Sequence, residues 1–328
     1  MLVLIRRCCL SDTPKNYPKV FAAILNWNGM VIDYNGTPIL ESCLKSLAKV
    51  DYPNIKFALI DADSKDESVE FAQKNFPEIQ IIKVKDKGSA ALQNEGISFA
   101  FKKCPEAEFI LLITNDMIFA ETKWLKKMVN AAEKEKSIGI VNCKLNYPNG
   151  KVQHGGTILS ILGVNMIHDA MLSNKSRYQH ISCSSLALIK KQALLYLGGF
   201  DEIFSPFSWE DIDISSRFLR NGYKLYYVGN TKIFHLESYS TLNRKIKKKW
   251  TPEEIEFCMR RNAYIYYLRY AKYLLPFYIF VDTASNIISF RNDKIAIRKN
   301  IGYRLRTQIP ALISALSLYK KNRIKKFT

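Results

Sequence analysis

The feature that most constrains the fold is an alternation of apolar and amphipathic stretches between Lys19 and about Val141. The apolar runs have the length and composition of buried strands: VFAAILNW (20–27), IKFALID (55–61), IQIIKV (79–84) and EFILLIT (108–114). The stretches between them have helical spacing: PILESCLKSLAKV (38–50), ESVEFAQKNF (67–76) and SAALQNEGISFAFKKC (89–104). This order predicts an α/β fold with a mostly parallel sheet flanked by helices on both faces.

In such a sheet, ligands bind beyond the carboxyl ends of the strands, so the loops after the first, second and fourth strands are candidate binding loops. The first two loops, NWNG and DADSKDES, contain neither a dinucleotide-binding fingerprint nor a P-loop. Asp61 and Asp63 could hydrogen-bond a base or a ribose. Turn formation and helix capping by Asp63, Ser64 and Asp66 explain the same residues equally well.

Positive charge is concentrated in one part of the chain. The 328 residues carry a formal net charge of +19. Residues 241–328 hold 20 Lys and Arg against 5 Asp and Glu, a net of +15, whereas the first 240 residues hold 29 against 25, a net of +4. A nucleic-acid enzyme more often spreads basic groups over its catalytic body. We therefore expect no nucleic-acid partner, and a basic tail on a nearly neutral body.

The cysteines and the N-terminus indicate the compartment. The seven cysteines are scattered and contain no CxxC pair, so neither a zinc site nor a disulfide framework is predicted. This usage fits a reducing cytosol. The opening apolar run, MLVLI, is shorter than the apolar region of a signal peptide, so we expect a cytoplasmic protein.

A possible metal ligand follows the fourth predicted strand. Asp116 ends the sequence Thr114-Asn115-Asp116, and a carboxylate just past a buried strand can bind a hard cation. A simple turn explains an isolated Asn-Asp dipeptide better. His235 follows a later strand and becomes a candidate ligand only if the fold brings it near Asp116.

Two adjacent acids open a predicted helix. Ser208 is expected to cap this helix, which places Glu210 and Asp211 in its first turn beside several aromatic residues. Simple capping explains the acids, but a carboxylate here could also act as a general base toward a hydroxyl. Asp213 and Arg217 are spaced to form an ion pair on the surface of the helix.

Seven motifs and a later histidine, His235, occur in order between Val20 and Ser240. The motifs are ILNWNG (24–29), IDADSKDES (60–68), DKGSAALQNEGI (86–97), LLITND (111–116), LNYPNGKVQHGG (145–156), GGFDEIF (198–204) and WEDIDISSRFLRNGY (209–223), the last of which includes the Glu-Asp pair. In this order they resemble the family 2 inverting glycosyltransferases with the GT-A fold, and most of all the rhamnosyltransferase-type branch. The resemblance implies a GT-A nucleotide-diphospho-sugar transferase domain over 19–240. Residues 1–18 would be an N-terminal extension and 241–328 a basic helical C-terminal region.

The resemblance also implies an activity. The enzyme would be a hexosyltransferase that moves a sugar, with rhamnose among the candidates, from a nucleoside-diphosphate sugar to a hydroxyl of a glycan or lipid-linked acceptor. This reaction belongs to cell-surface polysaccharide synthesis.

Site residues follow from matching positions. The resemblance assigns donor binding to Asn26, Asn28, Asp61, Asp63, Gly88, Asn94 and Asn115. It implies that Asp116 and His235 bind Mg²⁺ or Mn²⁺. Asp211 would be the catalytic base, with Glu210 and Trp209 contacting the acceptor.

The chain departs from the family pattern at one position. Thr114 stands where the family has Asp or Asn, two residues before the metal-binding Asp116. The metal site therefore has fewer anionic ligands than usual. The alternative function is a catalytically impaired nucleotide-sugar-binding protein of the same fold.

The most apolar stretch lies in the basic tail. LLPFYIFVDTASNIISF (274–290) is interrupted by Asp282 and falls short of the roughly 20 apolar residues of a spanning helix. Basic residues flank it and tyrosines are abundant, which suits a helix in the interface of an anionic membrane. A helical subdomain packed on the catalytic body is the alternative. We expect an enzyme bound peripherally at the inner face of the cell membrane.

Overall fold

The computed structural model of the chain describes residues 17–31, 33–160, 163–166, 169–182, 185–206, 208–236, 251–288, 294–321 and 324–327. Most of the expected N-terminal extension therefore lies outside the described residues. The junction expected at residue 240 and the basic run that follows it lie outside them as well.

The centre of the described part is a ten-stranded sheet. Its strands are β1 (Val20–Asn26), β4 (Ile55–Asp61), β5 (Gln80–Lys83), β6 (Phe109–Thr114), β7 (Met117–Phe119), β8 (Ile138–Asn146), β9 (Val152–His154), β12 (Arg177–Gln179), β13 (Leu186–Lys190) and β14 (Lys224–His235). The order is β12-β14-β8-β13-β6-β1-β4-β5, with β7 paired to β14 and β9 to β8. The predicted strands β1, β4, β5 and β6 are parallel to one another, while β13 runs antiparallel to both β6 and β8. The α/β prediction is confirmed, with a mixed sheet beyond β6.

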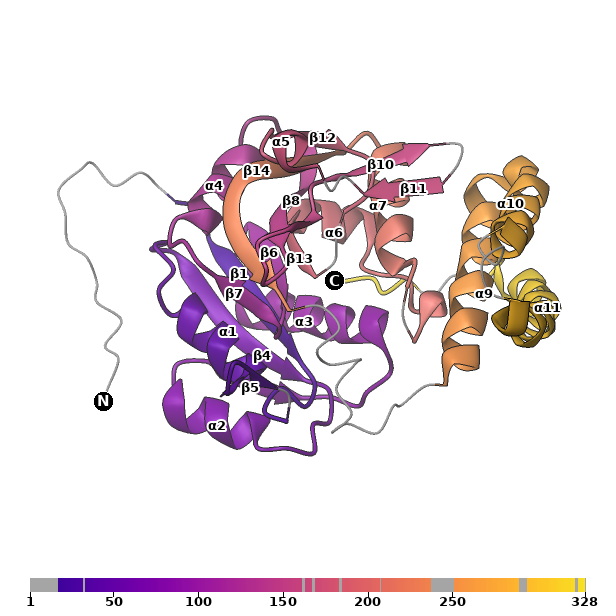
Figure 1. The fold of residues 1–328 in the computed structure, drawn as a ribbon. Coiled ribbons are helices and arrows are strands. Elements are labelled where there is room, and N and C mark those ends of the chain that lie inside the picture. Colours follow the sequence, from indigo (N-terminus) through magenta and orange to yellow (C-terminus); the bar gives the residue numbers. More distant parts are fainter. Residues whose placement is uncertain are drawn as a thin grey trace.

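Helices cover both faces of this sheet (Figure 1). One layer holds α1 (Ile39–Leu47), α2 (Ser68–Asn75) and α4 (Trp124–Ala132), and the other holds α3 (Ser89–Lys103), α6 (Lys191–Leu197) and α7 (Glu210–Arg220). Short elements complete the body: β2 (Asp33–Tyr34), β3 (Thr37–Pro38), β10 (Thr157–Ser160), β11 (Gly163–Met166), α5 (Ala170–Ser173) and η1 (Glu202–Phe204).

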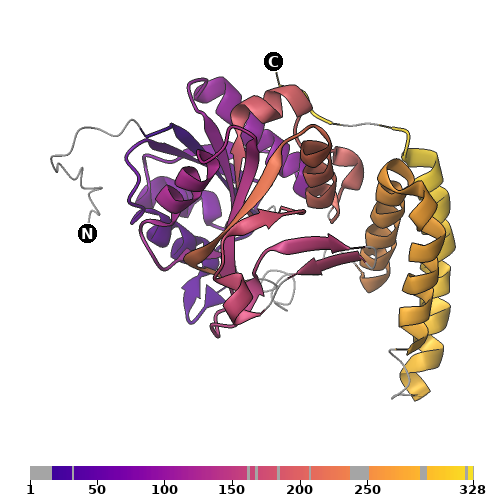
Figure 2. The same cartoon turned by 90° about the horizontal axis from the view of Figure 1, so that it is seen from above.

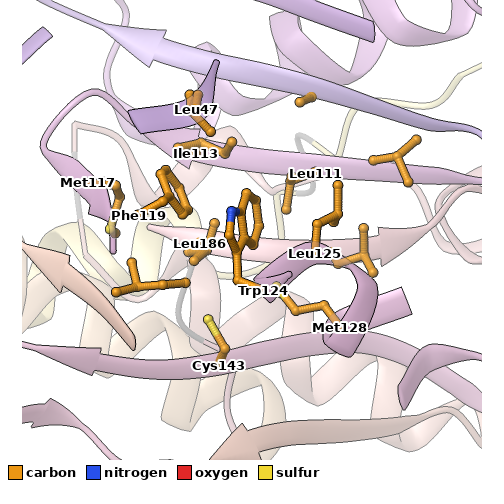
Figure 3. Close-up of a cluster of buried hydrophobic side chains, with 14 of the residues drawn as sticks. Leu47, Leu111, Ile113, Met117, Phe119, Trp124, Leu125, Met128, Cys143 and Leu186 are labelled. Carbon is orange, nitrogen blue, oxygen red and sulfur yellow. The ribbon is translucent and has the colours of Figure 1, made fainter. Parts of the chain in front are cut away.

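The two cores explain why β1 is apolar along its whole length. Successive side chains of a strand point to opposite faces of the sheet. Val20, Ala22 and Ile24 therefore join the core under α1 and α4, while the residues between them join the core under α3 and α6. In the first core the ring of Trp124 stacks on Phe119, with centroids 4.3 Å apart (Figure 3).

The C-terminal helices form a group at one end of the body (Figures 1 and 2). They are α9 (Pro252–Tyr270), η2 (Lys272–Leu274), α10 (Leu275–Ile288) and α11 (Lys294–Leu318). Tyr264, Tyr267, Ala311 and Ala315 pack in one apolar cluster with side chains of the α/β body, including Phe204. In the part of the chain that the structure describes, no helix combines the length and the apolar character needed to cross a membrane.

Asp282 lies inside this helical group. Its carboxylate pairs with Nε of Arg260 on α9 at 3.0 Å, and Nη1 of the same arginine donates to Oγ1 of Thr307 on α11 at 2.7 Å. One buried guanidinium thus joins α9, α10 and α11. The acid that interrupts the apolar stretch serves the packing of these helices on one another.

After α11 the chain returns to the α/β body. Ile324 forms a β-bridge with Asp201, and the backbone N–H of Gly199 donates to the carbonyl of Lys325 at 2.9 Å. The ring of Phe327 stacks on Phe101 of α3 at 5.0 Å between centroids. The segment 241–328 therefore contributes to the core of the body as well as to the helical group.

Candidate functional site

A buried polar cluster ties together three loops at the carboxyl edge of the sheet. Nδ2 of Asn26 donates to Oδ1 of Asp61 at 2.8 Å, and the amide of Asn115 donates to Oδ1 of Asn26 at 2.6 Å. The hydroxyl and the backbone N–H of Ser64 donate to the two oxygens of Asp61 at 2.6 and 3.0 Å. Three residues predicted to bind the donor are thus brought together, although both carboxylate oxygens of Asp61 already have partners.

Asn28 and Asp63 shape the rim of these loops. Both have a left-handed backbone, with φ of 48° and 55°, which Asn and Asp adopt more readily than most residues. The side chain of Asn28 accepts from the backbone N–H of Lys65 at 2.8 Å. The carboxylate of Asp63 is 59% exposed and pairs with Lys65 at 2.7 Å. Turn formation therefore accounts for Asn28, while Asp63 presents its carboxylate to solvent.

Asp116 and His235 meet at the ends of β6 and β14. The pairing of β14 with β7 places His235 opposite Met117, and Oδ2 of Asp116 lies 3.3 Å from Nε2 of His235. Nδ1 of His235 donates to Oε1 of Gln153 on β9 at 2.7 Å. Because Gln153 fixes one ring nitrogen, the other faces the carboxylate, where it can share a proton or, when deprotonated, bind a cation.

Thr114 acts on Asp116 through a hydrogen bond. Its hydroxyl donates to Oδ1 of Asp116 at 2.6 Å. Burial alone would raise the pKa of Asp116, but His235 and the Thr114 hydroxyl outweigh this effect, and the pKa lies below its ordinary value. Among the described residues there is no cluster of three or more His, Cys, Asp or Glu side chains that could hold a metal. Asp116 and His235 are the two candidate cation ligands at this place.

The predicted cap of α7 by Ser208 is wrong. Ser208 and Trp209 both have φ of 75°, the helix begins at Glu210, and Trp209 occupies the N-cap position without a side-chain hydrogen bond. The conformation of this turn is set by contacts from distant parts of the chain, which outweigh the local capping preference of a serine. Glu210 and Asp211 still lie in the first turn of the helix.

Burial changes the acid–base chemistry of this pair. Glu210 is 5% exposed, and its burial raises its pKa. Burial and the neighbouring charge of Glu210 raise the pKa of Asp211 to about 7. A carboxylate with a pKa near neutrality can accept a proton at physiological pH and still exist largely in its basic form just above it. Strongly perturbed carboxyl groups of this kind are typical of functional sites.

The C-terminal helices supply the surroundings of Trp209. Its ring centroid lies 5.4 Å from that of Tyr266, 6.2 Å from that of Tyr267 and 6.4 Å from that of Tyr278. Trp209 is half-buried, so part of its indole remains accessible beside the acids. The aromatic surface expected next to Glu210 is therefore built jointly by the body and the tail.

The predicted surface ion pair of α7 is buried. Asp213 is fully buried, and its Oδ2 pairs with Nε of Arg217 at 2.9 Å. The hydroxyl of Tyr270 on α9 donates to Oδ1 of Asp213 at 2.7 Å. The prediction of the pair is confirmed and the prediction of its exposure is wrong. The reason is that α9 covers this side of α7.

Gly88 and Asn94 join α3 to the chain ahead of α7. Gly88 has φ of 97°, and a Cβ at this position would lie 2.6 Å from the carbonyl oxygen of Pro206. Asn94 is fully buried, and its amide donates to the carbonyl of Phe200 at 3.0 Å and to Glu202 at 2.9 Å. Gly88 follows β5, so the acids of α7 are held at the same edge of the sheet as the polar cluster.

The contact of Gln153 with His235 could not be predicted from the sequence, because a lone glutamine carries no motif of its own. Its only signal is its place beside His154 in the motif that precedes the two glycines. The partners of α7 on α9 could not be predicted either, since they lie 50 or more residues further along the chain.

The fold, with its mixed sheet and the polar groups gathered at one edge, is that of the GT-A glycosyltransferases. Residues 30–197, just over half of the chain, match the family model described as glycosyl transferase family 2. The chain belongs to this family.

Curated relatives match part of the chain at low identity. The O-antigen biosynthesis protein RfbC of Myxococcus xanthus is 26% identical over 149 residues, which cover 42% of this chain and 12% of the relative. The uncharacterized protein y4gI of Sinorhizobium fredii (strain NBRC 101917 / NGR234) is 25% identical over 167 residues, 47% of this chain and 18% of the relative. The chain therefore spans less than a fifth of the length of these relatives.

Solved structures share the fold across nearly the whole chain. GalNAc-T7 with UDP, GalNAc and Mn²⁺ superposes with a TM-score of 0.62 at 14% identity, covering 90% of this chain and 56% of that one. TarS 1–349 of S. aureus in complex with UDP-GlcNAc superposes with a TM-score of 0.57 at 14% identity, covering 92% and 80%. At such identities the likeness shows the fold alone.

Proposed function

We propose that this member of glycosyl transferase family 2 is an inverting hexosyltransferase of cell-surface polysaccharide synthesis. It would move a sugar from a nucleoside-diphosphate donor to a hydroxyl of a glycan or lipid-linked acceptor. The observation that carries the proposal is the acid pair in the first turn of α7, in which Glu210 is buried, Asp211 is partly exposed and the pKa of Asp211 is raised to about 7. The names of similar proteins support sugar transfer in polysaccharide synthesis. One relative is named for O-antigen biosynthesis, and solved neighbours bind UDP-GlcNAc or UDP and GalNAc. Rhamnose is one candidate sugar.

Asp211 would act as the general base. Its carboxylate accepts the proton of the acceptor hydroxyl as that oxygen bonds to the anomeric carbon, while the bond from this carbon to the nucleoside diphosphate breaks. Attack and departure on opposite faces invert the anomeric centre in one displacement. Glu210 and the accessible part of Trp209 would contact the acceptor, and the cluster around Asn26 would line the donor pocket.

A divalent cation, Mg²⁺ or Mn²⁺, fits the pair formed by Asp116 and His235. One carboxylate and one imidazole 3.3 Å apart are a small ligand set, and such ions are commonly held by one or two carboxylates together with substrate phosphates. When bound, the ion would neutralise charge on the leaving diphosphate. Two neighbours contain Mn²⁺, GalNAc-T7 and the mannosyltransferase PcManGT of Pyrobaculum calidifontis with GDP-Man.

The test is turnover with a panel of UDP-, GDP- and dTDP-linked sugars, with Mn²⁺ and with excess chelator. We expect release of nucleoside diphosphate from one donor class with metal only, and its loss in Asp211→Asn. The matched control is Asp51→Asn, which removes a surface pair with Lys126. Full activity of Asp211→Asn would overturn the assignment of the base.

The second candidate function is nucleotide-sugar binding by a protein that has lost turnover. Thr114, which stands where the family has Asp or Asn, favours it. A binding protein of the same fold would gain thermal stability from a nucleotide sugar and release no nucleoside diphosphate from it.

We also propose that the tail binds the cytoplasmic face of an anionic membrane. Tyr273, Phe277 and Phe280 on η2 and α10 are exposed at spacings of four and three residues, and so are Ile309, Ile313 and Leu316 on α11. Ile309, Ile313 and Leu316 therefore form an apolar ridge on α11, and Phe277 and Phe280 form one on α10 with Tyr273 just ahead of it. The net charge of +15 over residues 241–328 suits anionic lipid headgroups.

Vesicle sedimentation tests this second proposal. The double variant Phe280→Glu and Ile313→Glu should lose binding to vesicles that contain anionic lipid, whereas wild type should bind these and ignore neutral vesicles. The control is Leu195→Glu, at an exposed apolar residue on α6 of the body. Equal sedimentation of wild type and the double variant would contradict the proposal that the tail binds a membrane.

A further inference from the structure

The chain that leads into the acid pair is held by one buried side chain of the tail. Asn262 on α9 is fully buried. Its Nδ2 donates to the carbonyl of Phe204 at 2.7 Å and to the carbonyl of Ser208 at 2.9 Å. One amide thus bridges both ends of the loop 204–208.

Neighbouring donors hold the middle of the same loop. The guanidinium of Arg261 donates to the carbonyl of Ser205, and the backbone N–H of Ser89 donates to the carbonyl of Pro206 at 2.8 Å. Arg261 also donates to Oδ1 of Asn262 at 2.8 Å, which fixes the orientation of that amide. Every described carbonyl from Phe204 to Ser208 is therefore bound by a group outside the loop.

This loop ends in an unfavourable backbone conformation. Ser208 and Trp209 are consecutive non-glycine residues with φ of 75°, a region that L-amino acids with a Cβ disfavour. Such conformations persist only where surrounding contacts over-determine them, and they cluster at functional sites. The amide of Asn262 holds the carbonyl of Ser208, the residue where the left-handed pair begins.

We propose that Asn262 is a positioning residue for the glycosyl transfer described above, which holds the left-handed turn at Ser208 and Trp209 so that Asp211 meets the acceptor hydroxyl. The inference rests on the proposed function for its kinetic consequence. The side chain of Asn262 is fully buried and bonded to the loop. It acts through the loop, so it should affect the chemical step and leave donor binding intact.

The test compares three full-length variants with wild type. Asn262→Ala removes the two donated hydrogen bonds, and Asn262→Asp keeps the size but turns an oxygen toward the two carbonyls. Thr307→Val is the matched control, because it removes a buried hydroxyl partner of Arg260 within the same helical group without touching the loop. The readouts are kcat, KM for the donor, and hydrogen–deuterium exchange of the segment 204–213.

Both Asn262 variants should lower kcat about 100-fold, as expected when a catalytic group is displaced by about 1 Å, with the KM for the donor within about twofold of wild type. Thr307→Val should keep kcat within about twofold. Exchange in 204–213 should quicken at least about tenfold in Asn262→Ala and stay unchanged in Thr307→Val. Unchanged kcat or unchanged exchange in Asn262→Ala would overturn the proposal. If wild type shows no turnover, the proposed function fails, and the exchange result alone decides whether Asn262 holds the loop.

Discussion

His235 donates a hydrogen bond of 2.7 Å from Nδ1 to Oε1 of Gln153, while its other ring nitrogen faces Asp116 at 3.3 Å. The two residues come from strands β9 and β14, on either side of β8. Groups that orient a metal-binding histidine act at a distance from the ion, because they fix the ring and its tautomer. In the metal site proposed above, Gln153 would orient His235 in this way.

The first prediction concerns Gln153→Leu. Without the acceptor for Nδ1, the imidazole can rotate, so the concentration of Mn²⁺ needed for half-maximal turnover should rise by about 10–100-fold. Turnover at saturating Mn²⁺ should change much less. A metal titration of donor turnover measures both. The control is Gln73→Leu, at an exposed position on α2, and equal metal requirements in the two variants would contradict the prediction.

The second prediction concerns Thr114→Val. The substitution preserves the shape of the side chain and removes a hydrogen bond of 2.6 Å to a largely buried carboxylate. Hydrogen bonds to charged groups contribute about 1.5–3 kcal/mol, so the free energy of unfolding should fall by about that amount. Urea unfolding at pH 7 measures it. An unchanged midpoint would show that the Thr114 hydroxyl does not stabilise Asp116, and Thr122→Val, at an exposed position, is the control.

The third prediction concerns pH. Asp211 must be deprotonated to accept a proton, and its pKa is raised to about 7, so kcat should rise with pH below about 7 and level off above it. The charge of Glu210 is one cause of the raised pKa, so Glu210→Gln should move the midpoint of the rise to lower pH. A pH–rate profile of each protein measures this. A midpoint that stays in place would contradict the assigned cause.

The same acid has a consequence for stability. The pKa of Asp211 is higher in the folded protein than in the unfolded chain, so the folded state binds more protons between about pH 4 and 7. The contribution of Asp211 therefore favours folding at low pH and is lost as pH rises through about 7. Asp211→Asn should flatten this part of the dependence of unfolding free energy on pH.

The fourth prediction concerns Asp282→Leu. The substitution makes the stretch 274–290 more apolar, yet it removes the acid that pairs with the buried guanidinium of Arg260. Removing one partner of a buried ion pair lowers the free energy of unfolding by about 3–5 kcal/mol. Because Arg260 also pairs with Glu256, we expect a loss near the lower figure. Chemical unfolding measures it. The control is Ser317→Ala, at an exposed position on α11, and a gain in stability would contradict the structural role given to Asp282.

The sequence could predict what depends on local pattern. Strands β1, β4, β5 and β6 and the helices between them follow from apolar periodicity, and the meeting of Asn26 with Asp61 follows from parallel strands that end at one edge. It could not predict the turn at Ser208, because the residue that fixes this turn, Asn262, lies 54 positions later. A capping preference is local, and it yields where tertiary contacts oppose it.

The return of the chain to the body links the two activities proposed for this protein, membrane binding and glycosyl transfer. Phe327 packs on α3, and Ile324 pairs with Asp201. At the other end of the helical group, α9 hydrogen-bonds the loop ahead of Glu210. The helical group is therefore attached to the body at both of its ends. The exposed ridges of α10 and α11 are therefore linked by packed contacts and hydrogen bonds to the backbone that carries the acids. Contact with a surface and competence for catalysis can therefore be thermodynamically coupled, each favouring the other, without any separate regulatory domain.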